Sequence, residues 1–358
     1  MTITTDFCGG NALILEFGEH TVCFRPELRD TTTAWFYWSF AVEGAAGKTI
    51  EFRITDCSPK EWIGPYGAAI SHDLIHWDWS GADGCNGDRF CYTFAENEDR
   101  VYFAHDMLYH PSNFHRFCEQ RKIQIRYIAE DRRGTPIPHI MVGNGENVIL
   151  LTARHHSCEA PGNYVLEGII DEFLDKPMSG WSIEAIPFVD ADGVVFGDQG
   201  KNRAPHDHYT DYLEELYPGV RAVKSVMMMK NVQAFFDLHA PWHFIDPMHP
   251  TDAHAFLVLT SSDKMDAYNR FSRLFFAECT SEGLIFDPKE NKPPGVGWNR
   301  HDTPVTSDKW FNAYHSVPIT LVLETSYFGD DTHIVSQNRL SMTGRSFMRA
   351  VKRFFEEI

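Results

Sequence analysis

Residues 147–174 read NVILLTARHHSCEAPGNYVLEGIIDEFL. The run at 147–152 is almost wholly apolar, which indicates a β-strand buried on both faces of a sheet. From Pro161 to Leu174 the apolar residues recur at helical spacing, so an amphipathic helix is expected there. The turn between them, residues 154–159, is polar and holds two histidines and a glutamate. This order is typical of an α/β domain that carries its chemistry at the carboxyl ends of its strands.

The same pattern continues along the second part of the chain. Further apolar runs lie at 182–189, 232–238 and 318–323, and they alternate with helical stretches at 263–282 and 344–357. The first part instead shows short aromatic or alternating runs separated by turn-rich segments, which are typical of an antiparallel sandwich. We therefore predict a small antiparallel β-sandwich domain over residues 1–115 and a mixed-sheet α/β catalytic domain over residues 116–358.

Composition narrows the classes of function. Lys and Arg number 32 and Asp and Glu number 50, so the net charge of −18 opposes nucleic acid or anionic membrane as a partner. No uncharged apolar run approaches the roughly 18 residues of a membrane span, and residues 1–7 do not resemble a secretory leader. The eight cysteines are sparse and form no CxxC pair, which favours reduced thiols. These features predict a cytoplasmic location.

Three of the predicted strands end in residues with metal or acid–base chemistry. His156 and Glu159 follow the first, His239 ends the second and Glu324 ends the third. Because the carboxyl ends of such strands meet at one edge of the sheet, the four side chains are expected to converge. Two imidazoles and one carboxylate form a catalytic zinc set, which leaves Glu324 as the general base. Taken singly, His155 is an alternative ligand, His239 could be a core histidine and Glu324 could cap a turn.

Four segments carry a family resemblance: ARHHSCEAPGNYVLEG at 153–168, PFVDADGVVFGDQGKNRAPHDHYTDY at 187–212, FFDLHAP at 235–241 and LVLETSYFG at 321–329. Together they resemble the zinc metallocarboxypeptidases, in particular the cytosolic carboxypeptidase branch. The N-terminal part is similar to the sandwich that precedes the catalytic domain there. The resemblance implies one Zn²⁺ held by His156, Glu159 and His239, and hydrolysis of an amide, expected to be a C-terminal peptide bond, by a zinc-bound water that Glu324 activates.

The resemblance also suggests supporting residues. Asp207 would accept a hydrogen bond from His156 and so orient the imidazole. Asp237 lies two residues before His239, so it either does the same for that ligand or is a solvated strand residue. For stabilising the developing oxyanion, Arg203 is the first candidate and Lys201 the second.

The chain departs from the family after Asp207. The usual Asn-Arg pair that clamps the terminal carboxylate of a substrate is replaced by Tyr209-Thr210. Tyr209 either lines the substrate pocket or packs in the core. Either another cation binds the carboxylate or the substrate has none at that position; the candidate cations are Arg154, Lys201, Arg203 and Arg300.

The same residues are compatible with more than one function. The substrate is expected to be the C-terminus of a peptide or protein, with Asp308 a candidate for favouring a basic residue. A zinc deacylase of N-acyl amino acids, resembling aspartoacylase, shares the metal arrangement, and the missing clamp favours it. A non-catalytic peptide-binding protein on the same scaffold would require a lost ligand or base. A second metal site is a weaker alternative, drawn from the histidines at 206, 208, 243, 249 and 254.

Overall fold

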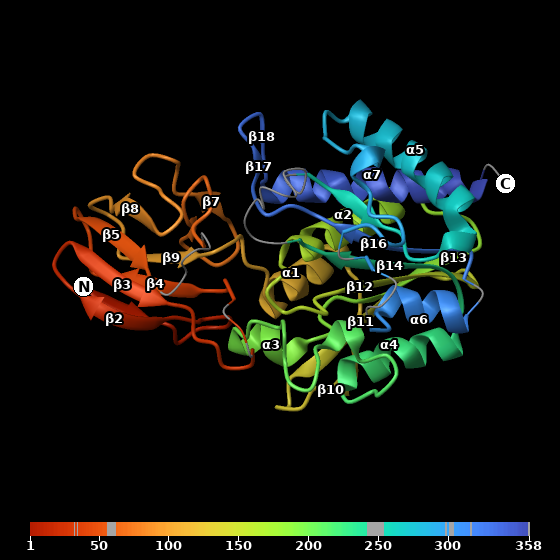
Figure 1. The fold of residues 1–358 in the computed structure, drawn as a ribbon, viewed down its shortest axis with the longest axis horizontal. Helices are drawn as coiled ribbons and strands as arrows, with labels where there is room; N and C mark the ends of the chain where they lie inside the picture. Colours follow the sequence, from red (N-terminus) through yellow and green to blue (C-terminus); the bar gives the residue numbers. More distant parts are fainter. Residues whose placement is uncertain are drawn as a thin grey trace.

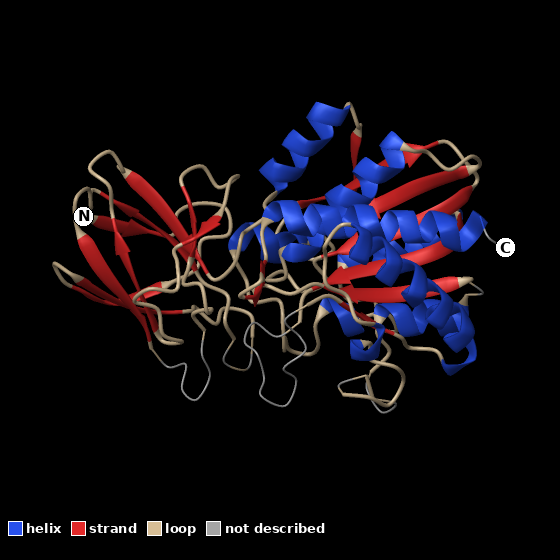
Figure 2. Cartoon of the chain, turned by 90° about the horizontal axis from the view of Figure 1, so that it is seen from above, coloured by secondary structure: helices blue, strands red, loops and turns tan. Residues whose placement is uncertain are grey.

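The computed structural model describes the chain apart from residues 32, 34, 56–61, 242–253, 298, 301–303, 316, 357 and 358. Strands and loops alone make up the described part of residues 1–110, and every helix follows after that point (Figures 1 and 2). Within the described ranges, no helix has the length and apolar character needed to span a bilayer.

The N-terminal part contains two sheets. The five-stranded sheet has the order β1 (Thr2–Thr4), β4 (Ser39–Glu43), β9 (Arg100–Ala104), β6 (Ala69–Ser71) and β7 (Asp78–Trp79). The four-stranded sheet has the order β2 (Leu13–Phe17), β3 (Thr21–Arg25), β5 (Thr49–Ile54) and β8 (Arg89–Thr93). Neighbouring strands are antiparallel except for β3 and β5, which are parallel. The predicted sandwich is therefore confirmed, with one parallel pair within it.

An aromatic core joins these two sheets. Side chains alternate in and out along a strand, so one face of β3, β5 and β8 presents Phe24, Phe52 and Phe90. These rings meet Phe40 and Phe103 of the other sheet, with centroids 4.9 Å apart for Phe24–Phe40 and 5.1 Å for Phe52–Phe103. The residues that alternate along these strands thus place their aromatic rings between the two sheets, where they form the core of the sandwich.

The rest of the chain forms a seven-stranded mixed sheet. Its order is β10 (Ile125–Glu130), β11 (Pro136–Gly143), β13 (Trp181–Ile186), β12 (Asn147–Ala153), β14 (Asn231–His239), β16 (Ile319–Glu324) and β15 (Phe256–Val258). The four central strands β13, β12, β14 and β16 are parallel, and the outer pairings are antiparallel. The central strands are nearly continuous apolar runs because helices cover both faces, as the sequence predicted.

Helices lie on both sides of this sheet. In Figure 1, α2 (Pro161–Asp175), α5 (Met265–Ser281) and α7 (Gln337–Glu356) lie above the central strands β12, β14 and β16, and α3 (Ala191–Phe196), α4 (Pro218–Met229) and α6 (Ser307–Tyr314) lie below these strands. Short 3₁₀ turns span 208–210, 262–264 and 288–290, and β17 (Gly329–Asp330) pairs with β18 (His333–Ile334). Helix α1 (Pro111–Arg121) crosses the proposed domain boundary at residues 115 and 116, and the division into two domains stays a prediction.

Helices α2 and α7 touch backbone to backbone. A Cβ atom on Gly168 would stand 2.0 Å from the carbonyl oxygen of Ser341, and one on Gly344 would stand 2.0 Å from that of Val165. Each helix therefore needs a glycine at the crossing, because any larger side chain would collide with the main chain of the other helix. Helix α2 begins directly after the polar turn at 154–160, so this contact holds the helix on which the turn rests.

We expect Gly344→Ala to lower the stability of the protein. Alanine gains about 1 kcal/mol of intrinsic helix propensity over glycine, but separating the two helices costs more, with a net loss of roughly 1–3 kcal/mol. Thermal unfolding should show a melting temperature several degrees below the parent. Asn338→Ala, at an exposed position of the same helix, is the control and should change little. A Gly344→Ala variant that melts at or above the parent temperature would contradict this account of the crossing.

Candidate metal centre

Strand register brings the predicted site residues together. Strands β12, β14 and β16 run parallel, and their pairing sets Thr152 opposite Asp237 and His239 opposite Glu324. The turn that follows β12 therefore emerges at the same edge as the ends of β14 and β16. His156, Glu159, His239 and Glu324 converge there, which is the placement that the sequence led us to expect.

Glu159 stands between the two imidazoles. Its Oε1 atom lies 2.9 Å from Nδ1 of His156, and its Oε2 atom lies 2.8 Å from Nδ1 of His239. One nitrogen or oxygen from each of the three residues falls within 4.8 Å of the others, and all three residues are buried. Two nitrogens and one oxygen are the donor set of a catalytic zinc site that keeps a position open.

The outward nitrogens of both imidazoles face carboxylates. Nε2 of His156 lies 3.6 Å from Oδ2 of Asp207, and Nε2 of His239 lies 3.1 Å from Oδ2 of Asp237. Metal-binding histidines usually carry such a carboxylate on the nitrogen that does not bind the metal, because it fixes the tautomer and orientation of the ring. The residues present therefore fit a zinc ion at the Nδ1 side of both rings.

Buried charges adjust one another at this site. Burial alone would raise the pKa of Glu159, but His156, Lys201 and His239 hold it well below its usual range. Burial would lower the pKa of His239, whereas the carboxylates of Asp237 and Glu159 raise it well above normal. The site thus concentrates ionised groups of both signs. A divalent cation bound there would displace protons from the ligand side chains.

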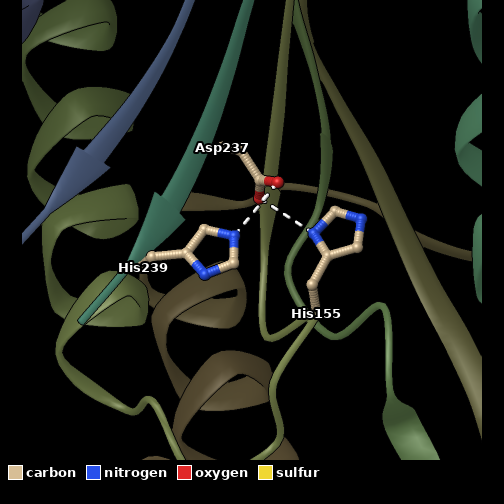
Figure 3. Close-up of side chains that lie close together, drawn as sticks. All are labelled: His155, Asp237 and His239. Carbon is tan, nitrogen blue, oxygen red and sulfur yellow. Dashed lines mark hydrogen bonds and ion pairs between the residues drawn. The ribbon is translucent and has the colours of Figure 1, made fainter. Parts of the chain in front are cut away.

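A rival group of possible ligands comprises His155, Asp237 and His239 (Figure 3). Nδ1 of His155 lies 2.9 Å from Oδ1 of Asp237, and its Nε2 lies 2.8 Å from the hydroxyl of Tyr212. Both ring nitrogens of His155 are therefore engaged, and neither His155 nor Asp237 lines the cavity beside the site. His156 fits the ligand position better than His155.

A cavity of about 410 Å³ opens beside the two imidazoles. Its walls come from the loop at 201–210, the ends of β14 and β16, the segment around α6 and the N-terminal part of the chain. The residues that line it are Trp35, His156, Lys201, Asn202, Asp207, Tyr209, Thr210, His239, Ala240, Pro241, Val258, Thr260, Asn299, Pro304, Thr306, Lys309 and Glu324. A space of this size can hold a peptide residue next to the candidate metal position.

Glu324 is a buried acid at the edge of this cavity. Among the described residues, none hydrogen-bonds its Oε2 atom. Burial raises the pKa of Glu324 to about 7, with a further rise from the nearby Glu159 charge and an opposing effect from His239. A carboxyl with a pKa near neutrality can both accept and return a proton, as a general base and acid must.

Lys201 supplies a cation at the same place. Its Nζ atom lies 3.0 Å from Oε1 of Glu159 and 5.8 Å from the ring centre of Trp35. Burial lowers the pKa of Lys201, but Glu159, Cys158 and Asp207 raise it more, so the ammonium stays charged at neutral pH. Lys201 therefore lies in the cavity, beside the candidate ligands.

Arg203 lies elsewhere. Its guanidinium contacts Asp30 at 2.7 Å, Asp190 at 2.8 Å and Asp198 at 3.3 Å, and it does not line the cavity. The structure thus brings Lys201, and not Arg203, to the position proposed for stabilising an oxyanion. Arg203 instead ties the loop that carries Lys201 to Asp30 of the N-terminal part.

The other cations proposed from the sequence also lie outside the cavity walls. Buried Arg154 has a left-handed backbone with φ of 62° and donates to the carbonyls of Tyr109 and Ser157, so it braces the polar turn from within. Arg300 is not a lining residue, but its carbonyl accepts a hydrogen bond from Nζ of Lys309 at 3.1 Å. Tyr209 does line the cavity, and its hydroxyl donates to buried Asp308 at 3.0 Å.

Among the lining residues that no sequence motif singled out are Trp35 and Lys309. Trp35 belongs to an aromatic run that a sandwich core explains as well, and a single lysine on α6 carries no signal of its own. The described histidines of the suggested second metal site lie with different carboxylates: His206 pairs with Asp211 at 2.7 Å and His254 with Asp330 at 3.0 Å. His208 lies 3.8 Å from Asp190 and forms a separate group of possible ligands with Asp131 and Asp190. His243 and His249 lie outside the described residues.

Comparison with known proteins defines the class. No protein-family model matches the chain. A solved metallo-carboxypeptidase from Burkholderia cenocepacia superposes with a TM-score of 0.79 at 15% identity, covering 99% of each chain. The metallo-carboxypeptidase of Pseudomonas aeruginosa, solved with (2-guanidinoethylmercapto)succinic acid, gives 0.78 at 18% identity over 100% of both chains. The chain has the metallo-carboxypeptidase fold, which confirms the predicted fold class.

Sequence relatives indicate the branch. Cytosolic carboxypeptidase-like protein 5 of Ailuropoda melanoleuca is 27% identical over 303 residues, which is 64% of this chain and 34% of that protein. Cytosolic carboxypeptidase 3 of Bos taurus is 24% identical over 62% of this chain and 27% of its own length. The chain thus spans between about a quarter and a third of these relatives. The resemblance to the cytosolic carboxypeptidase branch is confirmed.

We expect Glu324→Gln to stabilise the zinc-free protein at pH 8. Since folding raises the pKa of Glu324 from 4.5 to about 7, the group favours the folded state at low pH, and this contribution is lost as the pH rises through that interval. A neutral amide avoids the loss, on the order of 1–3 kcal/mol. Urea unfolding of variant and parent at pH 5 and pH 8 tests this. A stability difference that is the same at both pH values would show that Glu324 is not perturbed.

Proposed function

We propose that this protein is a zinc-dependent peptidase that removes residues from the C-terminus of a peptide or protein. The observation that carries the proposal is the convergence of His156, Glu159, His239 and Glu324 at the carboxyl ends of parallel strands, beside a cavity that all of them except Glu159 line. Seven described cysteines form no disulfide, and the named relatives are cytosolic, so we also propose a cytoplasmic location.

The chemistry divides among the residues by their positions. Zinc held by His156, Glu159 and His239 would supply a Lewis acid that polarises the scissile carbonyl and lowers the pKa of water. Glu324 accepts the proton of the attacking water and returns it to the leaving amine. Lys201 donates a hydrogen bond to the oxygen on which negative charge develops.

The proposed anchor of the substrate carboxylate is Lys309. Among the described lining residues the cations are Lys201 and Lys309, and Lys201 is held beside Glu159. Lys309 lies on α6, and its Nζ atom donates to the carbonyl of Arg300 at 3.1 Å. A single ammonium is a point charge and lacks the paired hydrogen bonds of an arginine fork, so carboxylate recognition should be less strict about orientation.

We expect Glu324→Gln to abolish turnover without loss of the metal. Removing a general base reduces kcat by about 10²–10⁴-fold, whereas zinc depends on the other three residues. The measurement combines elemental analysis of the purified protein with a peptide-cleavage screen read by mass spectrometry, which also shows which end is cut. Wild-type activity in Glu324→Gln would remove Glu324 from the mechanism. Tight binding of peptides by the zinc-loaded parent without any cleavage would instead indicate a binding protein.

We expect Lys309→Met to reduce kcat/KM about 10- to 100-fold for peptides with a free C-terminus, because a charge-assisted hydrogen bond is lost. Peptides with a C-terminal amide, poor substrates already, should be hardly affected. Lys176→Met, an exposed lysine at the end of α2, serves as the control. Equal losses on both kinds of peptide would show that Lys309 does not read the carboxylate.

A zinc deacylase of N-acyl amino acids is the second candidate. The observation that favours it is Thr210, which lines the cavity where the family places its carboxylate-clamping arginine. The same zinc and the same base would cleave the acyl amide. Parallel assays of N-acyl amino acids and peptides separate the two functions, since cleavage of the former alone would assign the deacylase.

A further inference from the structure

The carboxylate of Asp237 collects four contacts in the interior. Its Oδ1 atom accepts from the hydroxyl of Thr152 at 2.8 Å and lies 2.9 Å from Nδ1 of His155. Its Oδ2 atom accepts from the hydroxyl of Ser307 at 2.6 Å and lies 3.1 Å from Nε2 of His239. All five residues are at most 2% exposed, so no solvent competes for these contacts. Asp237 is therefore fully engaged by the protein itself.

The contacts determine which proton each ring carries. A carboxylate only accepts hydrogen bonds, so Nδ1 of His155 must donate to Asp237. The other nitrogen of His155 then accepts from the hydroxyl of Tyr212, at 2.8 Å. Both nitrogens of His239 also face carboxylates, since Nε2 lies 3.1 Å from Asp237 in an ion pair and Nδ1 lies 2.8 Å from Glu159. The proton on Nδ1 is therefore the one that a metal beside Glu159 would replace. Figure 3 shows Asp237 between the two imidazoles.

We propose that His155, acting through Asp237, is a positioning residue for the metal ligand His239. The chain Tyr212–His155–Asp237–His239 orients the ligand ring and keeps its Nδ1 atom available to a metal, although His155 itself binds none. The inference rests on the proposed zinc site and adds to it a residue that neither lines the cavity nor touches substrate.

Ser307 extends the network to the substrate wall. It is the first residue of α6, which also carries Lys309 at the cavity. The Asp237 carboxylate therefore contacts both the end of β14 and the beginning of α6. One buried anion holds the ligand strand and this wall of the cavity in a fixed relation.

The test is zinc affinity, measured by chelator competition on purified protein. Since outer partners of metal ligands typically contribute 10- to 100-fold in affinity, we expect His155→Phe to raise the Kd for zinc by that factor. Asp237→Asn should raise it at least as much. If His155 acts through Asp237, the double variant should be no weaker than Asp237→Asn alone. Thermal unfolding without zinc shows whether each variant is folded.

A milder matched pair keeps the test decisive if His155→Phe does not fold. Tyr212→Phe removes only the hydroxyl that orients His155, and we expect a several-fold rise in the Kd. Tyr164→Phe removes the hydroxyl of another buried tyrosine, which donates to the carbonyl of Leu108 at 2.7 Å and accepts from Gln337 at 3.1 Å, and it should leave the Kd unchanged.

Two results would overturn the inference: a Kd within twofold of the parent for folded His155→Phe or, failing that variant, for Tyr212→Phe; or an equal loss from His155→Phe with and without Asp237→Asn. Failure of the parent itself to bind zinc would overturn the proposed metal centre instead.

Discussion

The register between β14 and β16 is the constraint on which the candidate site depends. It sets His239 beside Glu324, the candidate ligand beside the candidate base, on neighbouring strands, 85 positions apart in the chain. Side chains alternate between the faces of a sheet, so a slip of one residue would turn one of the two away from the other. Both strands are apolar and buried on two faces. A slip is therefore unfavourable, because it would expose a whole row of side chains or make them collide with their neighbours.

Around that pair the fold gathers an excess of negative charge. Four carboxylates lie within or behind the cavity wall: those of Glu159, Asp207, Asp237 and Glu324. The side chain of Lys201 brings a positive charge among them. Buried carboxylates in such proximity need hydrogen-bond donors or a cation. The two imidazoles and Lys201 meet part of that need, and a divalent ion at the Nδ1 atoms would meet the rest. The electrostatic cost of the site and its capacity to hold a metal have the same origin.

The sequence supported the α/β architecture and the four converging residues because both follow from local patterns. Apolar runs predict buried strands, and the strand ends of a parallel sheet predict where polar residues meet. The residues that surround these four were harder to predict from the sequence. Lys201 and Arg203 are two residues apart in a loop, and only their partners in space, Glu159 for one and Asp30 for the other, separate their positions.

His155 illustrates the same limit. His155 comes directly before His156 in the chain, but its side chain lies on another face of the turn. That direction depends on contacts with Tyr212 and Asp237, which are distant in sequence. The parallel pairing of β3 with β5 was likewise not predictable, since the sequence of a short alternating strand does not indicate the direction of its neighbour. What escaped prediction in each case was a long-range contact and not a local propensity.

The N-terminal strands also have a place in the site. Trp35 lines the cavity, Asp30 accepts from the main-chain N–H groups of Gln199 and Gly200 as well as from Arg203, and Gln199 in turn bonds the main chain of Tyr37. The loop bearing Lys201 is therefore shaped as much by the sandwich as by the sheet that holds the ligands. A chain without residues 1–110 would keep the candidate zinc ligands. It would lose Trp35 from the cavity wall and the Asp30 carboxylate that holds the loop of Lys201.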